Sequence, residues 1–167
     1  MSPFTLRLSQ HEELPLDRLG DHPSLVALYD VWRARRVGDA LPPPLEIFDI
    51  PRPLLPYIML VDLEREAGLL RIRLAGTEVC ERHGGEMKGL THADFFDAGD
   101  AATVYDDARR VAASGRPSLT RRVYMAINHR YWSYVRLMLP LSRDGLTVDS
   151  FLKAVEPASM REAARRG

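Results

Sequence analysis

Residues 69–77, Leu-Leu-Arg-Ile-Arg-Leu-Ala-Gly-Thr, are the stretch that decides the fold of this chain. Their apolar residues alternate with Arg71 and Arg73, which is the period-two pattern of a half-buried β-strand. Gly76 interrupts the pattern, and the threonine after it is a residue type that begins helices. The stretch therefore predicts a strand that leads directly into a short helix over residues 78–83.

The residues before this strand complete a hairpin. Residues 58–63, Ile-Met-Leu-Val-Asp-Leu, form a short apolar run, and residues 64–68 have the composition of a turn that ends in glycine. Two apolar runs separated by such a turn are typical of antiparallel strands. We expect a β-hairpin over residues 58–75.

The residues after the short helix predict one longer helix and three more strands. Asp100 precedes a segment in which Val104, Ala108 and Val111 share one helical face, and Gly115 ends it. Apolar and β-branched residues then predict strands over 118–127, 131–141 and 147–155, with turns at Asn128-His129 and Asp144-Gly145. This part of the chain is predicted to be an antiparallel meander.

The two ends of the chain flank this predicted sheet. Residues 1–21 have no sustained period and are expected to form an arm or an irregular helix, whereas residues 22–37 predict a helix with Asp21 as its N-cap. Residues 38–56 are rich in proline and predict a connector without long regular elements. Residues 156–167 form a tail whose alanine, arginine and glutamate content suits a helical extension.

The order of these elements defines the predicted fold class. Two strands, a helical insert and three strands give an α+β fold, with a five-stranded antiparallel sheet that carries helices on one face. The N-terminal helix and the proline-rich connector precede it. With 167 residues, of which 46% are hydrophobic, the chain has the size of one domain, and residues 22–155 are its predicted extent.

Composition excludes several classes of function. The 23 basic residues balance the 23 acidic ones, so no general field attracts nucleic acid or an anionic membrane. Cys80 is the single cysteine, which excludes an intramolecular disulfide and a multi-cysteine metal site. The sequence contains no uninterrupted apolar span and does not begin like a signal peptide. We expect a cytoplasmic protein that binds neither membrane nor nucleic acid.

Three motifs carry a resemblance to a known family. They are Arg-Ile-Arg-Leu-Ala-Gly-Thr at 71–77, Gly-Glu-Met-Lys-Gly at 85–89 and Leu-Pro-Leu-Ser-Arg-Asp-Gly at 139–145. In this order, and after a helix with the His-Pro, Leu, Tyr and Trp pattern of residues 22–32, the chain resembles the small stand-alone PAS proteins common in alphaproteobacteria. The resemblance implies a sensory module that binds a small molecule between sheet and helices, or that dimerises. It implies no reaction, so no residue is assigned a catalytic role.

No cofactor follows from the sequence. The five histidines lack metal-ligand spacing, and no metal is expected. His83 and His92 flank the helical insert, where haem-binding PAS proteins supply an axial ligand, but loop histidines are the favoured interpretation. Cys80 lies where light-sensing relatives carry a flavin-reactive cysteine, yet the surrounding Glu-Val-Cys-Glu-Arg does not resemble their motif. Gly84-Gly85-Glu86 resembles a diguanylate cyclase signature only superficially.

Strand phase and the resemblance to PAS domains together predict a binding cavity. Its expected lining residues are Leu60, Ile72, Cys80, Phe95, Tyr124 and Leu137. A cavity of this composition suits a small, mostly apolar or aromatic molecule. Two alternatives remain at this stage: a ligand-free interaction module for dimerisation or adaptor contacts, and, more remotely, a small isomerase-like α+β enzyme. The enzyme would need an ionisable side chain that points inward, and no strand position requires one.

The strand at 131–141 is apolar on both faces and must therefore be covered twice. We expect a homodimer, or a regulatory protein partner, whose contact residues include Leu25, Leu28, Tyr29, Trp32, Trp132 and Tyr134. The alternative is that the helix at 24–36 covers the second face within one chain.

Overall fold

The fold is an antiparallel sheet that carries helices on both faces. A computed structural model describes residues 7–125 and 129–163. The sheet runs in the order β1-β4-β5-β6-β2-β3, and β7 pairs with the first part of β5, beyond the end of β6. The strands are β1 (Arg7–Leu14), β2 (Ile58–Glu64), β3 (Leu69–Ala75), β4 (Ser118–Met125), β5 (Tyr131–Leu141), β6 (Ser150–Val155) and β7 (Arg161–Ala163).

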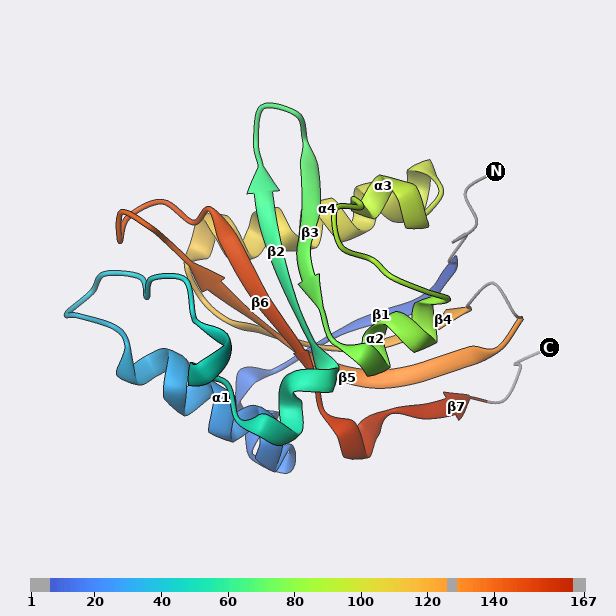
Figure 1. Cartoon of the computed structure of the whole chain (residues 1–167), viewed down its shortest axis with the longest axis horizontal. Helices are drawn as coiled ribbons and strands as arrows, with labels where there is room; N and C mark the ends of the chain where they lie inside the picture. Colours follow the sequence, from blue (N-terminus) through green and yellow to red (C-terminus); the bar gives the residue numbers. More distant parts are fainter. Residues whose placement is uncertain (1–6, 126–128, 164–167) are drawn as a thin grey trace.

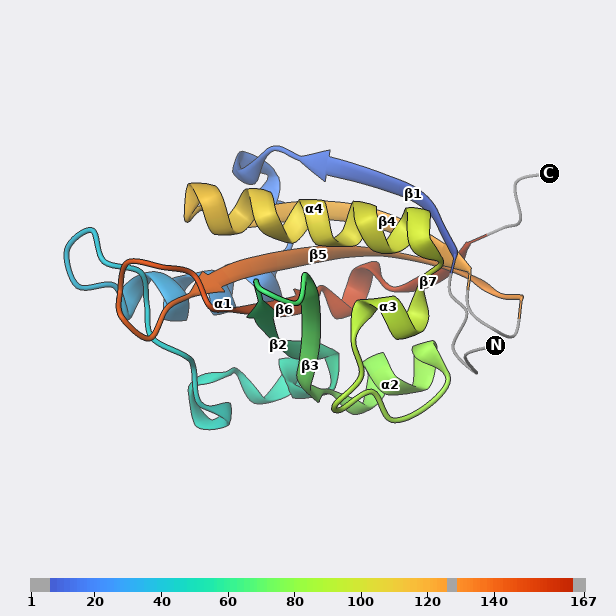
Figure 2. The ribbon, with the colours of Figure 1, turned by 90° about the horizontal axis from the view of Figure 1, so that it is seen from above.

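Four α-helices and four short 3-10 helices complete the described chain. They are α1 (Pro23–Ala34), α2 (Thr77–His83), α3 (His92–Phe95), α4 (Ala98–Ser114), η1 (Leu16–Asp21), η2 (Ile47–Asp49), η3 (Arg52–Tyr57) and η4 (Pro157–Ser159). In Figure 1, α1 lies at the lower left and α3 at the upper right, and α4 passes behind β2 and β3. Figure 2 shows α4 running alongside β4 and β5. The α+β class and the antiparallel sheet predicted from the sequence are confirmed.

The strand count is seven rather than five, because both ends of the chain join the sheet. Residues 7–14, expected to be part of an arm, form β1 on the outer edge of β4, with His11 opposite Arg122. In the expected tail, residues 161–163 pair with β5 as β7 instead of extending as a helix. The expected turn at Asn128 lies outside the described residues.

The sheet divides the core into two apolar clusters, one on each face. The first contains Val61, Ile72, Phe95 and Val104 and is covered by α2, α3 and α4. The second contains leucines of β5 and β6, and it is covered by α1 and the 3-10 helices of the connector. Strand β5, which is apolar on both faces, is therefore covered twice within one chain. This agrees with the alternative in which the helix at 24–36 covers the second face.

Helix α1 begins differently from the expectation. Its N-cap is His22 rather than Asp21, and the His22 side chain makes no capping hydrogen bond. Instead, the buried carboxylate of Glu156, just after β6, accepts hydrogen bonds from the backbone N–H groups of Ser24 at 3.1 Å and Leu25 at 3.3 Å. The cap is thus supplied by a residue 132 positions away in the chain, which fixes α1 to the end of β6.

Gly76 allows β3, α2 and the connector to meet. Its N–H donates a hydrogen bond to the carbonyl of Ile58 at 2.8 Å. A Cβ atom at this position would lie 2.3 Å from the carbonyl oxygen of Pro56, so no other residue fits without displacing backbone. The glycine that ends the fold-deciding stretch is therefore required by a close backbone approach.

Candidate functional site

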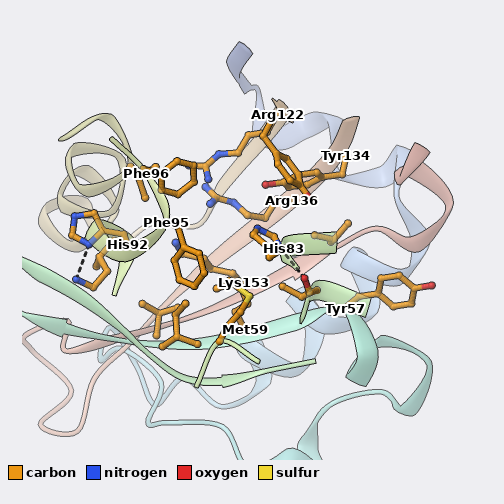
Figure 3. A pocket seen from close by; sticks show the side chains of 18 of the residues that line it. Tyr57, Met59, His83, His92, Phe95, Phe96, Arg122, Tyr134, Arg136 and Lys153 are labelled. Atoms are coloured by element: carbon orange, nitrogen blue, oxygen red, sulfur yellow. Dashed lines mark hydrogen bonds between the residues drawn. The ribbon is translucent and has the colours of Figure 1, made fainter. Parts of the chain in front are cut away.

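A pocket lies between the sheet and helices α2, α3 and α4, with a volume of about 70 Å³. Its apolar lining comes from Met59 and Val61 of β2, Ile72 of β3, Phe95 of α3 and Val104 of α4, among others. Figure 3 shows Phe95 near the middle of the pocket, with Met59 and Tyr57 on one side and Arg122 and Tyr134 on the other. The pocket therefore has an apolar side and a polar side.

The polar side is a product of strand register. Arg122 of β4 pairs with Tyr134 of β5, and Lys153 of β6 pairs with both Met138 and Met59. Because alternate residues of paired strands share a face, Arg122, Arg136 and Lys153 all point to the side covered by α4. Their exposed fractions are 4%, 3% and 6%, so the sheet presents three buried basic groups to the pocket.

Asp107 of α4 is the acidic partner of this group. Its Oδ2 accepts hydrogen bonds from Arg136 Nη2 at 2.8 Å and from Arg122 Nη2 at 3.5 Å. Burial alone would raise the pKa of Asp107, but the two guanidinium groups outweigh burial and lower the pKa to about 2. Asp107 is therefore an ion-paired carboxylate at neutral pH, and it ties α4 to β4 and β5.

His11 of β1 extends this cluster toward the sheet edge. Arg122 Nε donates a hydrogen bond to His11 Nδ1 at 3.1 Å. Burial, assisted by the charge of Arg122, lowers the pKa of His11 to about 4. His11 is neutral at pH 7, and it adds no positive charge to the cluster.

Lys153 differs from the two arginines because it has no close acidic partner. Among residues 7–125 and 129–163, none forms a hydrogen bond or an ion pair with its ammonium group. Burial, together with the charges of Arg136 and Arg122, lowers the pKa of Lys153 well below its ordinary value. A buried amine of this kind gains most from an added acceptor or negative charge.

Further polar atoms near the pocket also lack partners. Within the described ranges, Tyr124 Oη and Arg136 Nε are buried and form no hydrogen bond. Both can donate a hydrogen bond, and both residues line the pocket. Buried donors without acceptors are rare in folded proteins and call for a specific explanation, such as a bound molecule.

The two histidines of the pocket have defined orientations. The Nδ1 of His83 is 2.7 Å from the carbonyl oxygen of Val79, so Nδ1 carries the proton and Nε2 is left as an acceptor. Burial lowers the pKa of His83 to about 4, and the ring stacks on Tyr124 with centroids 5.1 Å apart. His92 Nδ1 accepts a hydrogen bond from the Leu70 N–H at 3.2 Å. Both residues were singled out from the sequence, and both line the pocket.

The residues predicted to line the cavity fall into three groups. Ile72, Phe95 and Tyr124 line the pocket. Leu60 and Leu137 do not, because the register places both on the opposite face of the sheet in the cluster under α1, so the predicted strand phase was wrong for them. Cys80 packs at the margin of the pocket-side core, where its Sγ lies 3.7 Å from the carbonyl of Ala75, and burial raises its pKa.

The residues predicted to contact a partner are mostly covered by their own chain. Leu25, Leu28 and Trp32 are no more than 1% exposed and pack on the second face of the sheet. Tyr29 is half-buried and stacks on Trp32. Trp132 and Tyr134 are buried on the pocket side, where the Arg82 guanidinium lies 4.1 Å from the Trp132 ring centre. The buried side chains in this group pack within their own chain and do not form an exposed contact surface, so the expectation was wrong for them.

The charged side of the pocket was not predicted from the sequence. No strand position was expected to direct an ionisable group inward, yet Arg122, Arg136 and Lys153 point inward from three neighbouring strands. One signal was present. Lys153 is a single charged residue in the apolar strand Ser-Phe-Leu-Lys-Ala-Val, every residue of which is buried.

The pocket differs from a metal site. No group of three His, Cys, Asp or Glu residues that could hold a metal ion occurs in the described part of the chain. The Gly84-Gly85-Glu86 motif follows α2, and the Glu86 carboxylate caps its own loop by accepting from the N–H of Lys88 at 3.0 Å. The chemistry available in the pocket is instead that of hydrogen-bond donors and positive charge.

A family model described as a PAS domain matches residues 20–156, which is most of the chain. The chain belongs to the PAS domain family. The PAS family is a family of sensory modules, and the pocket described above belongs to this PAS domain. The crystal structure of a Rhodobacter sphaeroides LOV protein is also similar, with a TM-score of 0.45 and 15% sequence identity, and the match covers 85% of this chain and 69% of that chain.

No curated protein matches this PAS domain. Within the ranges described, none of its helices combines the length and the apolar character needed to cross a membrane.

Proposed function

We propose that this PAS domain is a sensor that binds a small molecule in the pocket between the sheet and α2, α3 and α4. Occupancy is passed to a partner protein through altered surface contacts. The observation that carries the proposal is that Tyr124 Oη and Arg136 Nε are buried without hydrogen-bond partners, beside the buried amine of Lys153, around an apolar pocket. A bound molecule would satisfy groups that the folded chain leaves unpaired.

The connection to the surface runs through α4. Asp107 on the inner face of α4 is paired with Arg136 and Arg122, and Arg110 on its outer side reaches the same carboxylate with Nη2 at 3.5 Å from Oδ1. A ligand that takes up hydrogen bonds of Arg136 competes with Asp107 for that group. Weakening of the Arg136–Asp107 contact would then let α4, whose outer face is exposed, change its position.

The test is native mass spectrometry of the protein purified gently from a host of its own type. The proposal expects a bound small molecule that is reduced or absent in Val104→Phe, because Val104 is 3% exposed and the larger side chain enters the pocket. Circular dichroism establishes that the variant is folded. A wild-type protein that carries no small molecule, and that binds none of the probes described below, contradicts the proposal.

An alternative function is a ligand-free interaction module, and exposed apolar side chains favour it. Val37, Phe48 and Leu146 are 83%, 98% and 84% exposed. The first and last lie in loops joined by the hydrogen bond from Leu41 N–H to the Gly145 carbonyl, and Phe48 is next to Asp49, which pairs with Arg35 at the end of α1. These residues therefore gather at one end of α1, away from the pocket.

We propose this end of α1 as the contact region for a second copy of the chain. Exposed apolar patches of this kind often mark protein contacts. Sedimentation analysis of the wild type and of a double variant, Phe48→Ser with Leu146→Ser, tests the homodimer. A dimer that dissociates in the variant is expected, and a monomer at every concentration would contradict this alternative.

A further inference from the structure

The charges buried around the pocket do not balance. Arg122 and Arg136 carry two positive charges against the single negative charge of Asp107. Burial lowers the pKa values of His83 and His11 to about 4, so neither adds charge at pH 7. The cluster has a net charge of +1 when Lys153 is neutral, and +2 when Lys153 is protonated. One added negative charge would bring the first state to zero.

Apart from His83 Nε2, a neutral acceptor, the unpaired groups are also of one chemical kind. The Lys153 amine, the Arg136 Nε–H and the Tyr124 hydroxyl can each donate a hydrogen bond, and Arg136 Nε and Tyr124 Oη are orphaned. The carboxylate of Asp107, which lies near them, is already shared by Arg136, Arg122 and Arg110. What this side of the pocket lacks is an acceptor with negative charge, such as a carboxylate.

The size and the remaining lining restrict the rest of the ligand. A cavity of about 70 Å³ holds roughly five to seven water molecules, so it suits a molecule of few non-hydrogen atoms. Next to the basic groups, the lining is apolar and includes Ile72, Phe95, Val61 and Met59, and Met59 is the cross-strand neighbour of Lys153. An inorganic anion would leave this apolar side without a partner, whereas an acid with a short apolar body would cover it.

We propose that the ligand is a small organic acid, whose carboxylate is held by Lys153 and Arg136 and whose apolar or aromatic body packs against Phe95 and Ile72. The inference rests on the proposed function and narrows its ligand class. Lys153 is then a specificity-determining residue, since it distinguishes acids from neutral molecules of the same shape.

The experiment is an NMR titration of the ¹⁵N-labelled protein with matched pairs of acid and amide: butyrate with butyramide, and benzoate with benzamide. Inorganic phosphate is a further probe. Each probe is titrated into the wild type, Lys153→Met and Lys88→Met. Lys88 and Lys153 are the two lysines of the chain, and Lys88 is exposed, which makes Lys88→Met a matched control. Methionine keeps the length of the side chain and removes a buried amine, so Lys153→Met is expected to fold.

The inference predicts that at least one acid shifts the amide signals of Ile72 and Val104 and binds at least about tenfold more tightly than its amide. Lys153→Met is expected to lose about tenfold or more of that affinity, and Lys88→Met none. Equal binding of acid and amide, or full affinity in Lys153→Met, would overturn the inference that the ligand is an acid. The proposal that the pocket binds a small molecule would then still stand. Preference for phosphate would overturn the carboxylate class. If no probe binds and mass spectrometry finds a neutral compound in the protein, the inference of an organic acid is also overturned.

Discussion

Arg136 of β5 donates a hydrogen bond to Asp107 of α4 at 2.8 Å, and the side chains of both residues are at most 4% exposed. This pair joins the longest helix to the middle of the sheet at the edge of the pocket. Because both charges are buried, the loss of Asp107 leaves Arg136 without a counter-charge. The stability of the fold and the polarity of the pocket therefore depend on the same contact.

The first prediction concerns Asp107→Asn. The substitution leaves Arg136 and Arg122 without a counter-charge, and we expect it to lower the free energy of unfolding by about 3–5 kcal/mol in urea denaturation. Asp106→Asn is the matched control, because Asp106 is the adjacent residue and its side chain is 65% exposed. Equal effects of the two substitutions would show that the buried pair has no special role.

Acid provides a second readout of the same residue. The pKa of Asp107 is lowered from 3.8 to about 2 in the folded protein, so the stability that it contributes is complete above about pH 4 and is lost as the pH falls toward 2. Asp107→Asn is expected to flatten the stability profile over this window.

The second prediction concerns the half-buried His11 and His83. In the unfolded chain their pKa is 6.5, and in the folded protein burial lowers it to about 4 for His11 and His83. The unfolded state therefore binds more protons between these values, and stability falls as the pH is lowered from 6.5 to 4, by up to about 3 kcal/mol per histidine. Urea denaturation at pH 7 and pH 4.5 measures this loss.

His83→Phe separates the two contributions. Phenylalanine keeps the stacking on Tyr124 and cannot be protonated, so we expect the loss between pH 7 and 4.5 to be about half that of the wild type. His129 is exposed, and His129→Gln should keep the wild-type profile. A His83→Phe profile as steep as that of the wild type would contradict the assignment.

The third prediction concerns the cap of α1. Glu156→Gln keeps an oxygen acceptor for the Ser24 and Leu25 N–H groups but removes the negative charge at the helix N-terminus. We expect a loss of about 1 kcal/mol, and a larger loss of about 2–3 kcal/mol for Glu156→Met, which also removes the acceptor. Glu162→Gln, at an exposed position of β7, is the control and should have no measurable effect.

The fourth prediction concerns Gly76→Ala. A methyl group there would lie 2.3 Å from the Pro56 carbonyl oxygen, so β3 and the connector must separate, and we expect a loss of about 3 kcal/mol or more. Gly99→Ala adds the same methyl group within α4, where its nearest neighbour is an Asp97 oxygen at 3.7 Å. Thermal unfolding should show the control unchanged or slightly stabilised, since alanine favours helices. A Gly76→Ala protein as stable as the wild type would contradict the close approach.

Much of the fold follows from local patterns in the sequence. The alternation in residues 69–75, the glycine stops at Gly84 and Gly115, and the apolar stripe of α1 each depend on neighbouring residues only, and the structure has an element at each place. Gly84 and Gly115 both adopt a left-handed backbone, which explains why glycine ends these helices.

The outer strands could not be found in this way. Residues 7–14 of β1 have no apolar alternation, and pairing with β4 places them in the sheet, with His11 and Glu12 opposite Arg122 and Arg121. Such a strand depends on a partner more than one hundred residues away, so no local window contains its signal.

The apolar lining of the pocket was predicted in part, but its basic side was not, for a related reason. In β4, Ser118, Thr120 and Arg122 form a polar face, and a polar face of a strand ordinarily points to solvent. Here that face points inward, because the opposite face carries Leu119 against the cluster under α1. The same inversion explains why Leu60 and Leu137 were assigned to the wrong side. Polarity alone cannot distinguish a solvent face from a polar pocket.

The central claim, a buried basic pocket that takes a small acid, is tested most directly by the protonation state of Lys153. Labelling with ¹³C-lysine gives two side-chain signals, one from Lys88 and one from Lys153, and their chemical shifts report the charge of each amine during a pH titration. The titration is made with and without benzoate. Besides Arg122, Arg136 and Asp107, the groups that act on Lys153 include His92 of α3, whose pKa burial lowers.

Without ligand, we predict that the Lys153 signal titrates at a pH well below that of an ordinary lysine. With benzoate, the titration of the Lys153 signal should move to higher pH, because the carboxylate supplies the missing counter-charge. A Lys153 signal that titrates like an ordinary lysine, and that benzoate does not move, would contradict the account.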